Sequence, residues 1–504
     1  FFFYQAWSHH SVLAASHLHA SAMTLSKCIQ TRCFATIAGL GLVAVIVRFL
    51  QRQAQKRRLP PGDTGNLITG EFLKYVADTH GFFSERLAKF GGTFLTNLFF
   101  KDTVVLEPTA ANLKLMSSQN KLGWPTHFLD VIGQTALAMV NGAIHKKQRS
   151  ASGRAFNGKM LDSYLSSFQS LTMQHLERWT VSEQPKQMRE DVKFYTFELA
   201  QQVLLGVDLP EAQSKHMMDL MGKTIEGLAV LFPINFPGFH YRKILAARRE
   251  LVAVYQEIID EKRANPVQTP CSMIDYVMSD NGKDIKGMSD VELQDFCVNM
   301  SFAGHDTTLA TMQSLLYYLS VNPAMLEELR SEVYAAWDGK VAVSRPLLQG
   351  LVKCQAFIME VLRLIPPVPF MARELASSTN VDGYDLPAGM TIMFGIKSIM
   401  DRHFSEQGQN VDKLELGRWF DTDGKFVGQA KLYELASFSV FGAGGRMCIG
   451  YKFAMDELVV FLMNLIRNFD FTVVEAEKKC FPFAYWSVTA SFRKRNAAGD
   501  IVGA

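Results

Sequence analysis

Residues 441–450 read FGAGGRMCIG, a glycine-rich loop that delivers one cysteine, Cys448, to the start of a long helical pattern. At the amino terminus of a helix the dipole favours a thiolate, and Arg446 adds positive charge nearby. The glycines let the backbone approach a flat cofactor closely, and several loop amides are available to donate hydrogen bonds to the sulfur. Cys448 is therefore predicted to be a metal ligand or a nucleophile.

Helical periodicity dominates the second half of the chain, on both sides of this loop. The longest predicted helix covers about residues 289–322; Ser289 opens it, with Glu292 at the capping-box position. A second helix is expected over about 346–365, from a first-turn proline to a proline pair that stops it. A third follows the cysteine loop and continues to about residue 469.

Strand signals are weaker and gather in two regions. Residues 92–98 and 103–107 are alternating or β-rich, and a turn is expected between them at Lys101-Asp102. Residues 381–400 contain short strand-like pieces separated by DG and PAG turn signals. The predicted fold class is therefore mainly α with a smaller β lobe, an α+β arrangement.

The composition describes a globular protein with a large core. The chain has 504 residues, of which 48% are hydrophobic and 20% charged, and this excludes collagen-like, disordered and small disulfide-stapled classes. Its seven cysteines are odd in number and form no CxxC pair, so neither a disulfide framework nor a zinc knuckle is indicated. We expect a reducing compartment.

The positive charge of the chain is concentrated at its amino terminus. The first 62 residues contain seven Lys or Arg and no acidic residue, so the overall charge of +3 leaves 3 − 7 = −4 for the rest. In a nucleic-acid-binding protein, basic residues would instead cluster on the folded domain. We therefore expect no nucleic-acid partner.

The amino-terminal segment is predicted to anchor the protein in a membrane. Residues 34–50 contain the uncharged run FATIAGLGLVAVIV, which its flanks extend to about 18 residues, just long enough to span. The following segment, 51–62, is a basic and proline-containing hinge, and by the positive-inside tendency it places the body in the cytosol. Residues 1–33 are interpreted as a leader upstream of the anchor, with Met23 as the hypothetical natural start, and 63–504 as the catalytic domain. The alternative is a cleaved signal or plastid transit sequence over residues 1–50.

The cysteine loop resembles the haem-binding signature of the cytochrome P450 family, FxxGxRxCxG. The match covers Phe441, Gly444, Arg446, Cys448 and Gly450, and Gly442 belongs to the same loop. As a dinucleotide-binding fingerprint the stretch fails, because methionine stands where the last glycine is needed. The resemblance implies haem b, with its iron held by the Cys448 thiolate beneath a long central helix. The bland alternative is a buried cysteine in a glycine turn.

Glu360 and Arg363 place opposite charges at positions i and i+3 of the second helix. Alone, such a pair is more often a solvated surface pair. Just before a proline stop and upstream of a cysteine loop, it resembles the ExxR pair of the same family, whose third member is implied to be Arg418. Leu414 and Leu416 replace the usual Phe and Pro before that arginine.

The middle of the longest helix carries Ala303-Gly304-His305-Asp306-Thr307-Thr308, a run of poor helix formers. Ser and Thr side chains bond back to helix carbonyls and can open a groove. The run resembles the family's oxygen-binding motif, AGxDTT. That resemblance implies that Thr307 helps protonate bound dioxygen and that Asp306 relays protons from solvent. The alternative is a threonine-rich kink without a catalytic part.

Haem propionates are carboxylates and call for fixed cationic donors, preferably arginine. Arg446 matches the family position. By similarity, Arg373 and the pair His145 and Arg149 are the remaining expected partners, with His145 in place of the commoner tryptophan. An exposed helix face explains the basic run 146–149 equally well.

Three stretches indicate the class of substrate. Trp124-Pro125, LFPINFPG at 231–238 with Ala-Arg-Arg at 247–249, and EVLRLIPPVP at 360–369 are similar to retinoic acid hydroxylases, their cyanobacterial relatives and plant enzymes that oxidise sterols and terpenoid hormones. The implied substrate is a long apolar isoprenoid. The side chains expected around it are Trp124, Phe128, Phe302, Val368 and Phe370, each of which can also be plain core.

The sequence thus predicts a membrane-anchored haem-thiolate monooxygenase that inserts one atom of O₂ into an apolar C–H bond. The family resemblance implies electrons from a separate NADPH-dependent reductase or a ferredoxin, and we expect a monomer at the endoplasmic reticulum membrane or, alternatively, a plastid membrane. Two other classes remain open: a haem-thiolate isomerase or dehydratase that consumes hydroperoxides, and a haem sensor or lipid-binding protein without catalysis.

Overall fold

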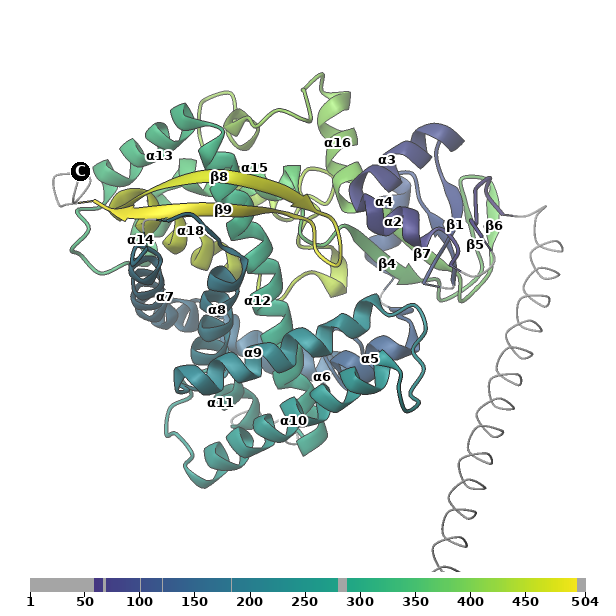
Figure 1. Ribbon diagram of the computed structural model, residues 1–504. Helices are drawn as coiled ribbons and strands as arrows, with labels where there is room; N and C mark the ends of the chain where they lie inside the picture. The colour runs from purple at the N-terminus through teal and green to yellow at the C-terminus, as the bar shows by residue number, and fades with distance from the viewer. Residues whose placement is uncertain are drawn as a thin grey trace, which may run out of the picture. The chain divides into compact units, whose positions relative to one another are not determined.

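One long helix, α12 (Asp290–Ser320), runs through the middle of the computed structural model (Figure 1). The structure describes residues 59–66, 69–99, 101–119, 121–182, 184–279 and 288–495. The predicted capping box is present, since Ser289 Oγ accepts from the Glu292 amide at 3.3 Å and Glu292 Oε2 accepts from the Ser289 amide at 2.9 Å. Both ends of the predicted helix are confirmed. The helix starts directly after the Ser289 cap, and it ends before Pro323, which opens the next helix.

Helices surround α12 on most sides. They are α2 (Phe72–Ala77), α3 (Thr79–Phe90), α4 (Ala110–Ser118), α5 (Thr126–Ile132), α6 (Gly142–Gly153), α7 (Gly158–Trp179), α8 (Arg189–Leu199), α9 (Glu211–Ile225), α10 (His240–Ala264), α11 (Met273–Met278), α13 (Pro323–Ala336), α14 (Arg345–Gly350), α15 (Val352–Leu364), α16 (Ile396–Glu406), α17 (Gly428–Lys431) and α18 (Tyr451–Asn468). The helix predicted after the cysteine loop is confirmed as α18.

The helix predicted over 346–365 is two helices, α14 and α15, that break at Leu351. Both carboxylate oxygens of Glu332 accept hydrogen bonds at the start of α15, from the Lys353 amide at 2.7 Å and the Cys354 amide at 2.9 Å. These amides would otherwise lack partners, so a side chain of α13 caps α15 and stabilises the break. Periodicity within the segment could not reveal a cap supplied by another helix.

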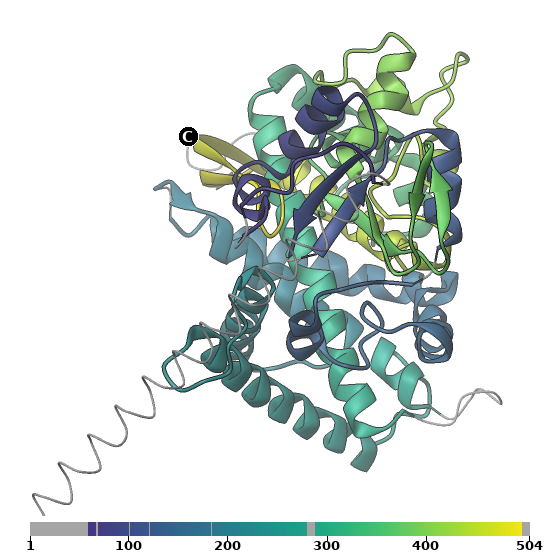
Figure 2. The ribbon, with the colours of Figure 1, turned by 90° about the vertical axis from the view of Figure 1, so that its right-hand side faces the viewer.

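The β lobe contains segments that lie far apart in the sequence. A four-stranded sheet has the order β1 (Phe94–Leu98), β2 (Lys101–Val105), β7 (Thr391–Gly395), β4 (Phe370–Glu374), with β2 and β7 parallel and the other pairs antiparallel. Purple β1 and β2 therefore lie beside green β4 and β7 in Figures 1 and 2. The remaining strands are β3 (Lys186–Gln187), β9 (Tyr485–Lys494) and β8 (Phe469–Lys479) in one sheet, and β5 (Thr379–Val381) and β6 (Tyr384–Leu386) in another.

The turn predicted at Lys101-Asp102 lies elsewhere, because Lys101 already pairs with Leu98 in the β1–β2 ladder. The chain reverses after Phe99, which has a left-handed backbone with φ 51°. The Phe99 ring is in edge contact with Phe72 and Tyr75, at centroid distances of 5.2 and 6.2 Å. This aromatic packing, which joins segments distant in sequence, explains why local turn propensity misplaced the reversal.

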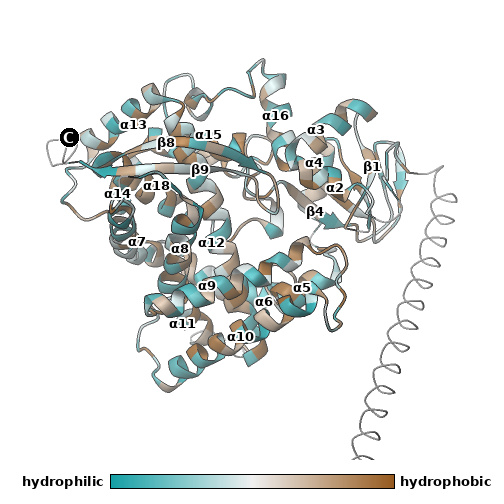
Figure 3. Ribbon diagram, in the orientation of Figure 1, coloured by the Kyte–Doolittle hydropathy of each residue, from teal (hydrophilic) through white to brown (hydrophobic). Residues whose placement is uncertain are grey.

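The surface helices are amphipathic, as the mixed colours of α10 in Figure 3 illustrate. Its buried residues recur every three or four positions, which places them on one face of the helix. They are Tyr241, Ile244, Ala247, Leu251, Tyr255, Ile258 and Ile259. The fold class predicted from periodicity, mainly α with a smaller β lobe, is confirmed.

The predicted leader (1–33), the anchor (34–50) and most of the hinge (51–62) lie outside the described residues. Across the ranges that are described, no helix combines the length and hydropathy that crossing a bilayer requires.

Candidate active site

The cysteine loop is a tight turn that is closed by a backbone hydrogen bond between its own residues. The Cys448 amide donates to the Phe441 carbonyl at 2.7 Å, and Gly442 and Gly444 both have positive φ. A Cβ on Gly444 would lie 2.3 Å from the Ser117 carbonyl oxygen, so only glycine lets the loop pack against the end of α4. These constraints deliver Cys448 just before α18.

Cys448 opens into a cavity of about 390 Å³ between the loop and α12. The accessible surface of Cys448 faces this cavity, since protein surrounds the residue on its other sides. Most residues singled out in the sequence meet here. Those that line the cavity are Trp124, His145, Arg149, Ala303, Gly304, Thr307, Val368, Phe370, Arg373, Phe441, Gly442, Arg446, Cys448 and Gly450.

Four of the residues expected at the haem, the oxygen site or the substrate do not line this cavity: Gly444, Phe128, Phe302 and Asp306. Phe128 is one layer behind it, stacked on Trp124 at a centroid distance of 5.8 Å. Phe302 instead contacts Phe483, at 5.9 Å. Helical geometry explains the last two, because Phe302 and Asp306 point about 100° away from their neighbours Ala303 and Thr307 on α12.

The threonines of α12 bond back to the helix, as their residue type predicted. Thr307 Oγ1 donates to the Ala303 carbonyl at 2.8 Å, Thr308 Oγ1 to the Gly304 carbonyl at 2.9 Å, and Thr311 Oγ1 to the Thr307 carbonyl at 2.9 Å. The helix nevertheless continues unbroken through this run. The Thr307 hydroxyl oxygen thus lies at the cavity wall with its proton held by α12.

Cationic side chains from three elements line the same cavity. Arg373 of β4 donates to the carbonyls of Gln119 at 3.0 Å and Ala443 at 3.4 Å, and Arg149 of α6 donates to the Met447 carbonyl at 2.8 Å. These bonds fix the guanidinium groups against backbone oxygens. Among the ion pairs of the described residues, none joins Arg149 or Arg373 to a carboxylate.

Burial lowers the pKa of these groups, and neighbouring positive charges add to the shift for Arg446 and His145. Burial lowers the pKa of Arg373 to about 10. Burial, then Arg373 and Arg149, lower the pKa of Arg446 to about 10, and burial, Arg446 and Arg149 lower the pKa of His145 to about 4. Cations that are withdrawn from water without a matched carboxylate are costly, so Arg149 and Arg373 fit a bound group that carries its own carboxylates.

The Cys448 sulfur calls for a positively charged partner, whereas the arginines call for a negatively charged one. Burial raises the pKa of the Cys448 thiol, while the Gly450 amide and the Arg149 charge oppose the rise. A metal cation at the sulfur would favour the thiolate strongly. The donor set therefore fits a flat group that is cationic at its metal and anionic at its edge, which describes haem.

Behind the loop, Glu360 is the centre of a fully buried charge cluster. Its carboxylate accepts two hydrogen bonds from Arg363, at 2.9 and 2.8 Å, and one from Arg418 Nε at 3.1 Å. The predicted triad is thus assembled, despite the leucines before Arg418. Sequence reasoning missed Trp419, whose Nε1 donates to Glu360 Oε2 at 3.1 Å; its place directly after Arg418 was the available signal.

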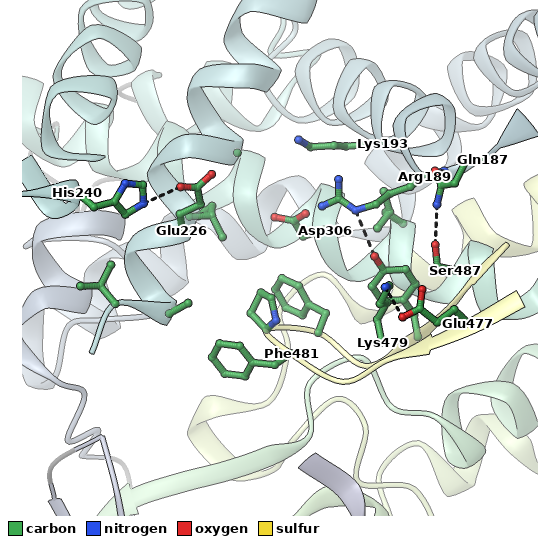
Figure 4. A pocket seen from close by; sticks show the side chains of 18 of the residues that line it. Gln187, Arg189, Lys193, Glu226, His240, Asp306, Glu477, Lys479, Phe481 and Ser487 are labelled. Carbon is green, nitrogen blue, oxygen red and sulfur yellow. Dashed lines mark hydrogen bonds and ion pairs between the residues drawn. The ribbon is translucent and has the colours of Figure 1, made fainter. Parts of the chain in front are cut away.

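Asp306 lines a second and larger cavity, of about 1060 Å³, together with residues of α8, β8 and β9 (Figure 4). Arg189 and Lys193 lie in its wall, and Arg189 Nε donates to the Tyr485 hydroxyl at 3.2 Å. Size alone would favour this cavity as the active site. It contains neither a cysteine nor a glycine loop, however, so we assign the chemistry to the smaller cavity.

Asn299, Met300 and Thr311 also line the smaller cavity and were not singled out in the sequence. Asn299 and Thr311 continue the four-residue spacing of Ala303 and Thr307, which places all four on one stripe of α12. That spacing was the signal that could have found them.

Comparisons with known proteins agree with this geometry. A family model described as Cytochrome P450 matches residues 60–494. Taxane 13-alpha-hydroxylase from Taxus cuspidata is 24% identical over 455 residues, covering 86% of this chain and 90% of that protein. Cytochrome P450 26B1 from Rattus norvegicus is 26% identical over 443 residues, covering 85% and 83%. The solved structure of retinoic acid bound cyanobacterial CYP120A1 aligns with a TM-score of 0.76 at 26% identity, covering 87% of this chain and 99% of that one.

Replacing Glu360 by Gln removes the negative charge that two buried guanidinium groups share. We expect the Glu360→Gln variant to lose about 3–5 kcal/mol of unfolding free energy, measured by chemical denaturation. Glu415→Gln is the matched control, because Glu415 pairs with the same Arg418 at 3.4 Å but is 38% exposed; its loss should stay below about 1 kcal/mol. Equal losses for the two variants would contradict the assigned role of the buried cluster.

Proposed function

This chain belongs to the cytochrome P450 family, and on that premise we propose that it is a monooxygenase that hydroxylates an apolar isoprenoid-type substrate. The observation that carries the proposal is the single cavity that joins Cys448, the α12 stripe and an apolar wall. The enzyme class follows from the family: a haem-thiolate monooxygenase that uses haem b, O₂ and NADPH-derived electrons from a reductase.

Haem, when bound, supplies the activation of O₂ and the insertion of one oxygen atom into a C–H bond. In our proposal Cys448 ligates the iron, with Phe441, Gly442, Gly444 and Gly450 shaping the loop around it. Arg446, Arg373, His145 and Arg149 bind the carboxylates. The close packing of Gly444 on α4 and the bonds of Arg373 and Arg149 to backbone carbonyls support this division, because they hold the donors in place before any ligand arrives.

Protons reach the cavity from α12. Thr307 is proposed to present its hydroxyl to the oxygen site between Ala303 and Gly304, and Asp306 to exchange protons with the larger cavity. Since Asp306 and Thr307 are adjacent but face different cavities, this arrangement passes protons across the helix while the helix separates substrate from the larger cavity.

The proposed substrate contacts are apolar. Trp124, Val368 and Phe370 line the cavity, with Phe128 stacked behind Trp124. Phe302 lies outside the cavity lining and contacts Phe483 instead. The class of substrate, an isoprenoid such as a retinoid, a carotenoid fragment, a sterol or a terpenoid, is supported by relatives named for taxane hydroxylation and by a neighbour solved with retinoic acid.

Electrons are proposed to come from a separate NADPH-dependent reductase, or a ferredoxin, that docks on a monomer near Lys452.

Residues 34–50 are proposed to anchor the domain 63–504 in the endoplasmic reticulum membrane, with the plastid membrane as the alternative. On that proposal the native protein stays in the membrane fraction during alkaline carbonate extraction; its complete release would contradict an anchor that spans the bilayer.

Replacing Cys448 by Ala removes the proposed iron ligand. The reduced, carbon-monoxide-treated wild-type protein should show the red-shifted Soret band of thiolate-bound haem, and Cys448→Ala should abolish it. Cys480→Ser is the control, because Cys480 does not line the cavity, and it should keep the band. A folded Cys448→Ala variant with wild-type absorbance would reject the assignment.

Replacing Thr307 by Ala removes the hydroxyl proposed to deliver protons. With reductase and NADPH present, we expect about tenfold less hydroxylated product per NADPH, with the electrons diverted to hydrogen peroxide. Ser314→Ala, which removes a hydroxyl bonded to a helix carbonyl outside the cavity, should leave the product yield unchanged. An unchanged yield in Thr307→Ala would contradict the proton-delivery role, whereas turnover of hydroperoxides without NADPH would point to an isomerase or dehydratase instead.

A further inference from the structure

One polar group in the cavity wall has no partner. Asn299 lines the cavity and is 2% exposed, and its Oδ1 atom is enclosed without any hydrogen bond to the residues described. An amide oxygen accepts hydrogen bonds, so this atom can pair with a donor such as a ligand hydroxyl.

The other polar side chains of the same helix face are already satisfied. Thr307, Thr308 and Thr311 each donate their hydroxyl to the carbonyl four residues earlier. The cationic residues of the cavity belong to other elements and point to the edge where the haem carboxylates are proposed to bind. Asn299 differs from these threonines, because its amide oxygen on the same helix forms no hydrogen bond to the described residues.

The surroundings of Asn299 cannot supply that partner. Met300, its neighbour on α12, lines the cavity too, and so do Leu137 and Ala138 of the segment after α5, all of which are apolar. An unpaired buried amide costs about 1–3 kcal/mol, and a protein recovers this when a ligand pairs with it. A hydroxyl group on an otherwise apolar ligand would do so, because it donates to the amide oxygen.

We propose that Asn299 Oδ1 accepts a hydrogen bond from a hydroxyl group already present on the substrate, and that this residue thereby selects a hydroxylated isoprenoid over a hydrocarbon of the same skeleton. This inference rests on the proposed function and narrows its substrate class. Asn299 lies four residues before Ala303 and eight before Thr307, or about 6 and 12 Å along the helix axis. The carbon that is oxidised is therefore a different carbon from the one that carries the existing oxygen.

The test compares matched ligands on the haem-loaded full chain. Retinol is titrated against its hydrocarbon axerophthene, β-ionol against its deoxygenated hydrocarbon, and cholesterol against 5-cholestene, with displacement of the water ligand read from the Soret spectrum. We expect wild type to bind at least one alcohol about tenfold tighter than its hydrocarbon, because one hydrogen bond to a buried amide has about that value. Asn299→Leu should lose this preference by weakening the alcohol only.

Thr311→Val is the matched control, since Thr311 lines the same stripe but its hydroxyl is already bonded to the helix; the preference should persist. Asn299→Ala replaces Asn299→Leu if the latter does not load haem. A tenfold preference that survives removal of the amide, or wild-type binding of both members of every pair with equal affinity, overturns the inference while leaving the proposed function intact. Failure of every ligand to bind wild type overturns the proposed substrate class instead, and the inference with it.

Discussion

The structure depends on one buried carboxylate. Glu360 accepts hydrogen bonds from Arg363 of its own helix, from Arg418 and Trp419, and from the Glu415 amide at 3.1 Å. Arg363 in turn donates to the Val411 carbonyl at 2.8 Å. A charge cluster without exposure is stable only when every member is satisfied, so the segment around residues 411–419 has one position against α15. The loop that carries Cys448 follows this segment along the chain.

Burial acts in opposite ways on the ionisable groups of the core and of the cavity. Burial raises the pKa of Glu457 well above its usual value and lowers the pKa of His305, so it disfavours the charged form of both groups. Arginine cannot respond in this way, because even a lowered pKa leaves it charged at neutral pH. The charged guanidinium groups of Arg149 and Arg373 therefore destabilise the protein without a ligand, and a ligand with carboxylates would offset that destabilisation. The same reasoning applies at smaller scale to the amide of Asn299.

The helix α12 separates two environments with a single stretch of residues. Ala303, Gly304 and Thr307 face the cavity with Cys448, whereas Asp306 and Leu309 face the larger one. Because neighbouring residues of a helix differ by about 100° in direction, one turn is enough to place a hydroxyl and a carboxylate in different cavities. The helix continues through the back-bonded threonines without a break, which keeps the partition intact.

The sequence alone determined the features that depend on local spacing. The capping box at Ser289, the i to i+3 pair of Glu360 and Arg363, and the glycine loop before α18 are short-range patterns, and each is formed as predicted. Tertiary structure decided the rest, because contacts between distant segments have no local signature. It broke a predicted helix with a cap from Glu332, moved the β1–β2 reversal to Phe99 through aromatic packing, set Phe128 and Phe302 behind the cavity wall, and left the amide of Asn299 without a partner.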